Sequence, residues 1–200
     1  RERRIYYGKC VGSGETYLSS EYKRTYYPGQ DETYYSKDYD EKGNITYSSV
    51  DEYKGNVRQK NTYLNTWNEG KSKEEKVTTY KYKDGKLSSS TTKRTSTYGE
   101  DVYKYKGKAE YDQSGFIIKE TEYRIDGEEE KKTNYTEYLY TIVNGKQVLA
   151  KRNNYYIDSD GKAILSSYDE YGYDEHGNQI GQVYYSVDYA GNAKPYTLTE

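Results

Sequence analysis

Tyrosine and aliphatic residues alternate with charged or hydroxyl residues over much of this chain. In the two YKYK segments, 80–83 and 103–106, tyrosine falls on one side of an extended backbone and lysine on the other. Segment 136–143 (TEYLYTIV) would place two sets of residues on opposite sides of a strand: Thr136, Tyr138, Tyr140 and Ile142 on one, and Glu137, Leu139, Thr141 and Val143 on the other. A period of two is typical of β-strands, and no window of useful length combines the apolar spacing of a helix with helix caps. The pattern predicts an all-β protein with essentially no helix.

Glycines separate the alternating segments. Those in turn-like sequences are mostly 12 to 18 residues apart, at positions 29, 43, 55, 70, 85, 99, 107, 115, 127, 145, 161, 177 and 191. Asn-Gly and Asp-Gly supply the positive φ angles of two-residue hairpins, which predicts such turns at Asn144-Gly145, Asp84-Gly85 and Asp126-Gly127. Strands of about 8–11 residues between tight turns give an antiparallel up-and-down meander of about a dozen strands.

Tyr-Asp-x-x-Gly is a second turn pattern, which occurs at 39–43, 111–115 and 173–177. Its aspartate is expected to accept hydrogen bonds from backbone N–H groups two residues further on, and its glycine to take the left-handed position that closes the turn. The residues concerned are Asp40, Gly43, Asp112, Gly115, Asp174 and Gly177. The repetition therefore indicates hairpin structure rather than chemistry.

Segment 158–161 (DSDG) is partly similar to a calcium loop, but a hairpin turn closed by Gly161 is the better interpretation. Aligning Gly161 with the loop glycine puts Tyr156 at the first ligand position and Ser167 at the last, where carboxylates are needed. No metal site is predicted.

The composition limits how such a sheet can be stabilised. Ile, Val, Leu and Phe make up only 13% of the residues, whereas 31 of the 200 residues are tyrosine and the formal net charge is −2. Tyrosine covers apolar area while its hydroxyl group stays in water, and it favours strands. We therefore expect one elongated β-hairpin repeat domain over residues 1–200, largely a single-layer or thin curved sheet held by cross-strand pairs.

Charge is unevenly distributed and marks one candidate binding region. Residues 71–108 carry a net charge of +6, and residues 109–200 carry −8. The basic segment contains both YKYK strands, so a ligand-binding surface is predicted at Tyr80, Lys81, Tyr82, Lys83, Tyr103 and Tyr105. Such side chains could stack sugars and attract anionic polymers; simple charge balance is the alternative. The charge split also permits self-association.

Nucleic acid is not expected as a partner, because Arg94 is the only arginine in the basic segment and the chain as a whole is acidic. No cofactor or catalytic group is predicted either. The only histidine, His176, lies in a hairpin turn, far in sequence from the only cysteine, Cys10, and a lone histidine makes no catalytic constellation. The sole tryptophan, Trp67, is expected to anchor a small core with Leu64 and neighbouring tyrosines, the alternative being an exposed stacking platform.

The cellular setting is predicted from composition alone. The chain has no apolar run long enough to span a membrane and no recognisable signal peptide. It lacks methionine and has one cysteine, which is typical of a mature or excised part of an exported protein. We expect an extracellular or cell-surface bacterial location.

The motifs at 39–44, 111–115 and 173–178 resemble those of the YD-repeat (RHS-like) proteins of bacterial surfaces. There each motif forms a β-hairpin, and hairpins stack into long sheets or shells. The resemblance implies an exported, non-catalytic scaffold.

Segment 154–165 (NYYIDSDGKAIL) is similar to one unit of the choline- or glucan-binding cell-wall repeats. That resemblance implies ligand sites built by neighbouring hairpins. The sequence thus favours a scaffold, spacer or adhesion element without catalysis, and the alternative is a module that binds cell-wall or host polysaccharide through tyrosine side chains.

Overall fold

The structure is a computed structural model, which describes residues 2–9, 16–24, 32–68 and 70–199. Cys10 and Gly29 lie outside the described residues. The strands are β1 (Glu2–Lys9), β2 (Thr16–Arg24), β3 (Glu32–Tyr39), β4 (Ile45–Lys54), β5 (Val57–Trp67), β6 (Ser72–Lys83), β7 (Lys86–Tyr98), β8 (Asp101–Tyr111), β9 (Ile117–Asp126), β10 (Glu129–Val143), β11 (Lys146–Ile157), β12 (Ala163–Tyr173), β13 (Gln179–Val187) and β14 (Ala193–Thr199).

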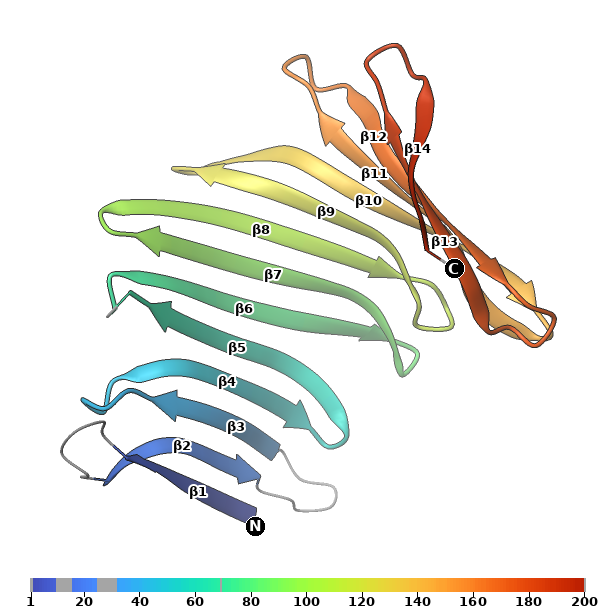
Figure 1. The fold of residues 1–200 in the computed structure, drawn as a ribbon. Coiled ribbons are helices and arrows are strands. Elements are labelled where there is room, and N and C mark those ends of the chain that lie inside the picture. The colour runs from blue at the N-terminus through green and yellow to red at the C-terminus, as the bar shows by residue number, and fades with distance from the viewer. Residues whose placement is uncertain (1, 10–15, 25–31, 69, 200) are drawn as a thin grey trace. The chain divides into compact units, whose positions relative to one another are not determined.

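The spatial order of these strands is the same as their order in the sequence, from β1 to β14. Figure 1 shows each strand beside the one that follows it in the chain. The pairing is antiparallel, as between β4 and β5 or β12 and β13. The described residues contain no helix, and therefore none that could cross a membrane. The predicted all-β, up-and-down meander is confirmed, and its strands form one open sheet.

Two compact units can be distinguished. Unit 1 comprises Arg1–Lys83 and Ser90–Lys106, and unit 2 comprises Asp84–Ser89 and Gly107–Glu200. The expectation of one repeat domain over residues 1–200 stays a prediction.

The turns are of the two predicted kinds, those closed by an aspartate side chain and those of two residues. Asp40 Oδ1 accepts hydrogen bonds from the backbone N–H groups of Lys42 and Asn44, at 2.9 and 2.8 Å, and Gly43 has a φ of 79°. The same arrangement closes four other hairpins in the described residues, at Asp112, Asp158, Asp174 and Asp188. Asp158 follows an isoleucine and Asp188 a valine rather than a tyrosine, so the aspartate and the glycine define the turn.

The two-residue turns at 84–85 and 144–145 are confirmed, since both residues of each have positive φ, with Asn144 at 48° and Gly145 at 73°. Two other predictions are wrong. The turn near Asp126 is shifted by one residue: Asp126 pairs with Glu129, which leaves Gly127 and Glu128 in the loop. Gly107 is not in a turn but inside β8, because its lysine-rich neighbours continue the strand alternation.

Burial in this sheet belongs mainly to small side chains. Among the described residues the buried ones are Glu21, Ser72, Ser90, Ser96, Ala109, Thr121, Ser167 and Asp169. Ser72 shows the reason. It pairs with Trp67 of β5, and the Trp67 ring meets the Tyr98 ring of β7 at a centroid distance of 5.9 Å. Since β6 lies between β5 and β7, the two rings meet above the serine. Long side chains of neighbouring strands thus do what a second layer does in most proteins.

Trp67 does not pack with Leu64 as predicted. The β5–β6 register pairs Trp67 with Ser72 and Leu64 with Glu75, so Trp67 and Leu64 lie three residues apart on opposite faces of the strand. Trp67 is half-buried and its aromatic partner is Tyr98.

Candidate binding surfaces

The first four predicted ligand residues, 80–83, lie on β6 and alternate in exposure, as the YKYK pattern predicts. Tyr80 and Tyr82 are half-buried, whereas Lys81 and Lys83 are exposed. The tyrosines and the lysines therefore point to opposite faces of the sheet. A flat ligand on one face cannot contact both kinds of side chain.

The four predicted tyrosines share one face of unit 1. Thr78 lies on the same side of β6 as Tyr80, and its hydroxyl group hydrogen-bonds to that of Thr92 on β7 at 2.8 Å. Arg94 follows Thr92 by two residues, so it lies on the same side. Its guanidinium carbon is 4.4 Å from the centroid of the Tyr105 ring. Tyr82 lies two residues from Tyr80, and Tyr103 lies two residues from Tyr105, so both are on this side as well. We call the surface formed by Tyr80, Tyr82, Tyr103 and Tyr105 the tyrosine face.

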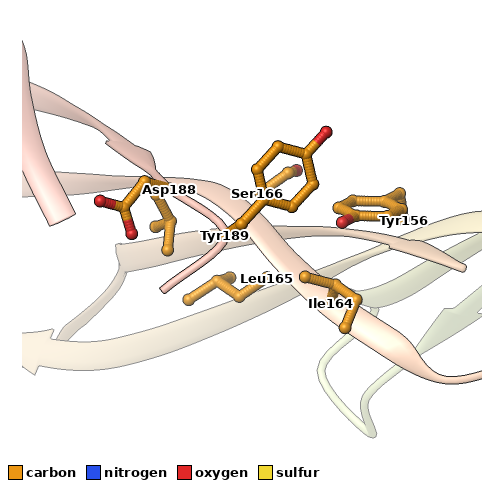
Figure 2. Close-up of a pocket in the computed structure, with 7 residues that line it drawn as sticks. Tyr156, Ile164, Leu165, Ser166, Asp188 and Tyr189 are labelled. Carbon is orange, nitrogen blue, oxygen red and sulfur yellow. The ribbon is translucent and has the colours of Figure 1, made fainter. Parts of the chain in front are cut away.

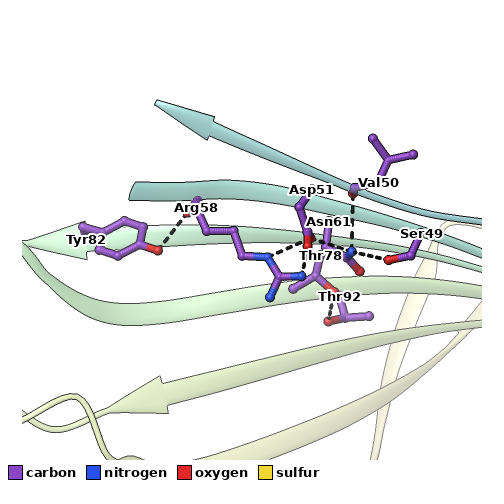
Figure 3. Close-up of polar contacts among 8 residues, drawn as sticks. All are labelled: Ser49, Val50, Asp51, Arg58, Asn61, Thr78, Tyr82 and Thr92. Atoms are coloured by element: carbon purple, nitrogen blue, oxygen red, sulfur yellow. Dashed lines mark hydrogen bonds and ion pairs between the residues drawn. The ribbon is translucent and has the colours of Figure 1, made fainter. Parts of the chain in front are cut away.

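A polar network that the sequence pattern did not reveal lies beside these tyrosines on the same face. Asp51 on β4 forms an ion pair with Arg58 and accepts a hydrogen bond from Asn61 Nδ2 at 2.8 Å. Arg58 in turn lies over the Tyr80 ring at 5.2 Å, and its backbone carbonyl accepts a hydrogen bond from Tyr82. Figure 3 shows these side chains reaching toward one another from neighbouring strands.

Trp67, Tyr98 and Tyr103 form an aromatic cluster at the end of the tyrosine face where β5 and β7 end and β8 begins. The Tyr98 and Tyr103 rings meet edge to face at 6.2 Å, and the backbone N–H of Gly99 donates to the carbonyl oxygen of Lys71 at 3.0 Å, which ties the two adjacent turns together. Half of Tyr98 and 40% of Tyr103 remain exposed. These rings can therefore contact a ligand as well as each other.

In unit 2 the tyrosine rings mostly stack on one another. The centroids of Tyr135 and Tyr155 are 4.5 Å apart at an interplanar angle of 11°, and those of Tyr168 and Tyr185 are 4.5 Å apart at 15°. Lysine side chains cover the rings as well: Lys119 and Lys132 lie over Tyr135, and Lys151 lies over Tyr168. These stacks and their lysine contacts stabilise the sheet.

Unit 2 also contains an ion pair whose carboxylate is buried while its arginine is partly exposed. Asp169 on β12 is only 2% exposed, and its carboxylate accepts hydrogen bonds from Arg152 Nε at 3.0 Å and from Gln182 Nε2 at 2.8 Å. Strands β11 and β13 supply these two donors from either side. No sequence signal marks this pair, because acidic and basic residues are spread over the strands.

A hollow of about 230 Å³ lies where β11 ends, β12 begins and β13 ends. Figure 2 shows the Tyr189 and Tyr156 rings on two sides of it, with Leu165 and Ile164 below and Ser166 and Asp188 at its margin. Val187 completes the lining. A β-bulge lies at the hollow: Asn154 pairs with Ser167 and Tyr155 with Leu165, which leaves Ser166 without a pairing partner in the strand.

The other sequence candidates lie in turns. His176 is exposed, its backbone N–H donates to Asp174 Oδ1 at 2.9 Å, and its ring nitrogen is 3.6 Å from the carboxylate of Glu175. Gly161 and Asp158 close a hairpin, as predicted. Within the described ranges, no group of three or more His, Cys, Asp or Glu side chains is placed to hold a metal ion.

No known protein family matches this chain, and no curated protein is significantly similar to it.

Proposed function

We propose that this chain is a non-catalytic β-repeat module of a bacterial surface or secreted protein, where it acts as a scaffold, spacer or adhesion element. The observation that carries the proposal is the strand order, in which each strand lies beside its neighbours in the sequence. Proteins built in this way are stabilised by interfaces between adjacent repeats and can be lengthened without redesigning a central core. Length and lateral surface are what a spacer or an adhesion element needs.

Truncation tests the modular part of this proposal. A chain that ends at Val187 lacks the last described hairpin turn and β14, but it retains every contact made within β4 to β13. We expect its far-ultraviolet circular dichroism per residue to be unchanged and its urea midpoint to fall only slightly. Complete loss of structure would show that the sheet depends on a cooperative whole, contrary to the proposal.

Binding of cell-wall or host polysaccharide is the second candidate function, and the tyrosine face favours it. Four tyrosines lie on one side of β6 and β8 with the Trp67–Tyr98–Tyr103 cluster beside them. Aromatic rings can stack on the C–H faces of sugars, while the phenol hydroxyl groups supply hydrogen bonds. A sheet face suits an extended polymer better than a small molecule, which needs a concave site.

A glycan array combined with a cell-wall pulldown tests the second candidate. The variant is Tyr80→Ala/Tyr82→Ala/Tyr103→Ala, and the matched control is Tyr135→Ala/Tyr155→Ala/Tyr168→Ala, which removes three stacked tyrosines of unit 2. Binding that is lost in the first variant and kept in the control supports the tyrosine face. Circular dichroism checks that both variants are folded; binding that two folded variants lose equally, or that neither loses, removes the tyrosine face from consideration.

A further inference from the structure

We propose that the hollow between Tyr156 and Tyr189 binds one pyranose ring of an uncharged glycan. This site lies in unit 2 and goes beyond the tyrosine face proposed for unit 1. Its volume is about 230 Å³. An engineered apolar cavity of about 150 Å³ holds benzene, whereas sites for drug-sized ligands usually measure about 300–1,000 Å³. The hollow therefore has room for one six-membered ring with its substituents.

The lining has the two kinds of surface that a sugar ring presents. Ile164, Leu165 and Val187 supply aliphatic surface, and Tyr156 and Tyr189 supply aromatic rings on two sides. These groups suit the C–H faces of a pyranose. Tyr189 is 97% exposed, so its ring has almost no intramolecular contact to lose when a ligand stacks on it.

Ser166 and Asp188 supply the polar groups at the margin of the hollow. Ser166 Oγ donates to the carbonyl oxygen of Asn154 at 3.0 Å, and it can still accept a hydrogen bond from a sugar hydroxyl. Asp188 Oδ2 accepts one hydrogen bond, from Asn192 Nδ2 at 3.2 Å. A carboxylate oxygen can accept more than one, so Oδ2 is able to accept a second from a sugar hydroxyl.

The electrostatics favour an uncharged ligand over an ionic one. Hydrogen bonds from the backbone and side chain of Asn192 lower the pKa of Asp188, and the positive charge of Lys194 lowers it further. The ionised carboxylate disfavours acidic sugars. Its oxygens already accept three hydrogen bonds from the turn, and Lys194 offsets its charge, so a cation gains little there.

The experiment is saturation-transfer difference NMR with four probes: methyl β-glucopyranoside, methyl β-galactopyranoside, methyl β-glucuronide and choline. A single ring gives affinities on the order of millimolar. The variant Tyr189→Ala is compared with Tyr196→Ala, an equally simple change of an exposed tyrosine (78%) that does not line the hollow. Tyr189→Phe keeps the ring. Circular dichroism confirms that all three variants are folded.

We expect a neutral glycoside to give a signal that Tyr189→Ala weakens about fivefold and that Tyr196→Ala and Tyr189→Phe leave unchanged. The proposal is overturned if neither neutral glycoside gives a signal at a ligand concentration 20-fold above the expected millimolar dissociation constant. It is also overturned if Tyr189→Ala binds as well as the parent, or if glucuronide or choline binds more strongly than both neutral glycosides. Because the tyrosine face is tested by other variants, failure here leaves that proposal standing.

Discussion

Tyr82 donates a hydrogen bond of 2.8 Å from its hydroxyl group to the backbone carbonyl oxygen of Arg58 on the neighbouring strand. The same relationship recurs in unit 2, where Tyr140 and Tyr173 donate to the carbonyl oxygens of Ile117 and Leu149. In each case the tyrosine lies near the end of one strand and the acceptor near the start of the strand before it. Each ring therefore covers the end of a strand pair while its hydroxyl group satisfies a backbone acceptor.

Tyr82→Phe should lower the free energy of unfolding by about 1 kcal/mol, because the carbonyl of Arg58 loses a donor while the ring remains. Urea unfolding followed by circular dichroism measures this change. Tyr103→Phe is the control, since Tyr103 contacts Tyr98 through its ring, and its effect should stay within about 0.5 kcal/mol. Equal effects of the two substitutions would mean that the hydroxyl bond contributes nothing.

Arg152→Ala should lower the free energy of unfolding by about 3–5 kcal/mol, because it leaves the buried carboxylate of Asp169 without its cation. The neighbouring pair of Lys151 and Glu170 is a matched control, since both of its side chains are partly exposed. Lys151→Ala should cost about 0–1 kcal/mol. Urea midpoints with unchanged slopes measure both, and a loss for Arg152→Ala no larger than that for Lys151→Ala would contradict the burial of Asp169.

Gly145→Ala should destabilise the hairpin by about 1–2 kcal/mol, because Gly145 has a φ of 73° and residues with a Cβ atom are strained there. Gly172→Ala makes the same chemical change inside β12, where a Cβ atom would meet Ile180 Cγ1 at an ordinary 3.8 Å. We expect Gly172→Ala to have little effect on the urea midpoint. The turn assignment is wrong if both variants are equally stable.

Ser72→Leu should cost about 1–3 kcal/mol by overpacking, since Ser72 lies beneath the contact between Trp67 and Tyr98. Trp67 is the only tryptophan, so its fluorescence reports the change directly. Lys73→Leu alters the next residue, which faces the other side of the strand, and should leave the emission of Trp67 unchanged. An unaltered emission in Ser72→Leu would place the rings elsewhere.

The aspartate turns should weaken in acid. Hydrogen bonds from the Asn44 side chain lower the pKa of Asp40, those from the Asn178 side chain lower that of Asp174, and the backbone N–H of Asn192 lowers that of Asp188. A lowered pKa in the folded state gives stability that is present above the unfolded-state pKa, about 3.9, and is lost as the pH falls through the folded-state value.

The triple variant Asp40→Asn/Asp174→Asn/Asp188→Asn should therefore lose less stability than the parent between pH 5 and the lowest pH at which both fold. Thermal unfolding over this range measures the slope of stability against pH. Asp101→Asn, which changes an exposed aspartate at the start of β8, should keep the slope of the parent. A triple variant as acid-sensitive as the parent would rule out the turns as the source.

The strands and turns could be predicted from sequence because both depend on local physics. Alternation fixes which side of a strand a residue occupies, and Asp-x-x-Gly needs only its own side chain and backbone to close. The error at Asp126 shows the limit: Asp-Gly and Gly-Glu turns are both allowed there, and the pairing of Asp126 with Glu129 decides between them.

The contacts between strands could not be predicted in the same way. The Asp169–Arg152 pair and the hollow beside Tyr189 depend on which residues stand opposite each other, and bulges such as the one at Ser166 change that register without a marked sequence signal. Leu64 was wrongly predicted as a partner of Trp67 for the same reason, because the tyrosine that contacts Trp67 is Tyr98, which reaches it across an intervening strand.

Native-state hydrogen exchange tests the central claim, a sheet whose stability is distributed over neighbouring strand pairs rather than concentrated in a core. We predict opening free energies that differ from one strand pair to the next, and that Arg152→Ala lowers protection mainly in β11, β12 and β13. A single common opening free energy for all the strand amides, lowered everywhere by Arg152→Ala, would contradict the account.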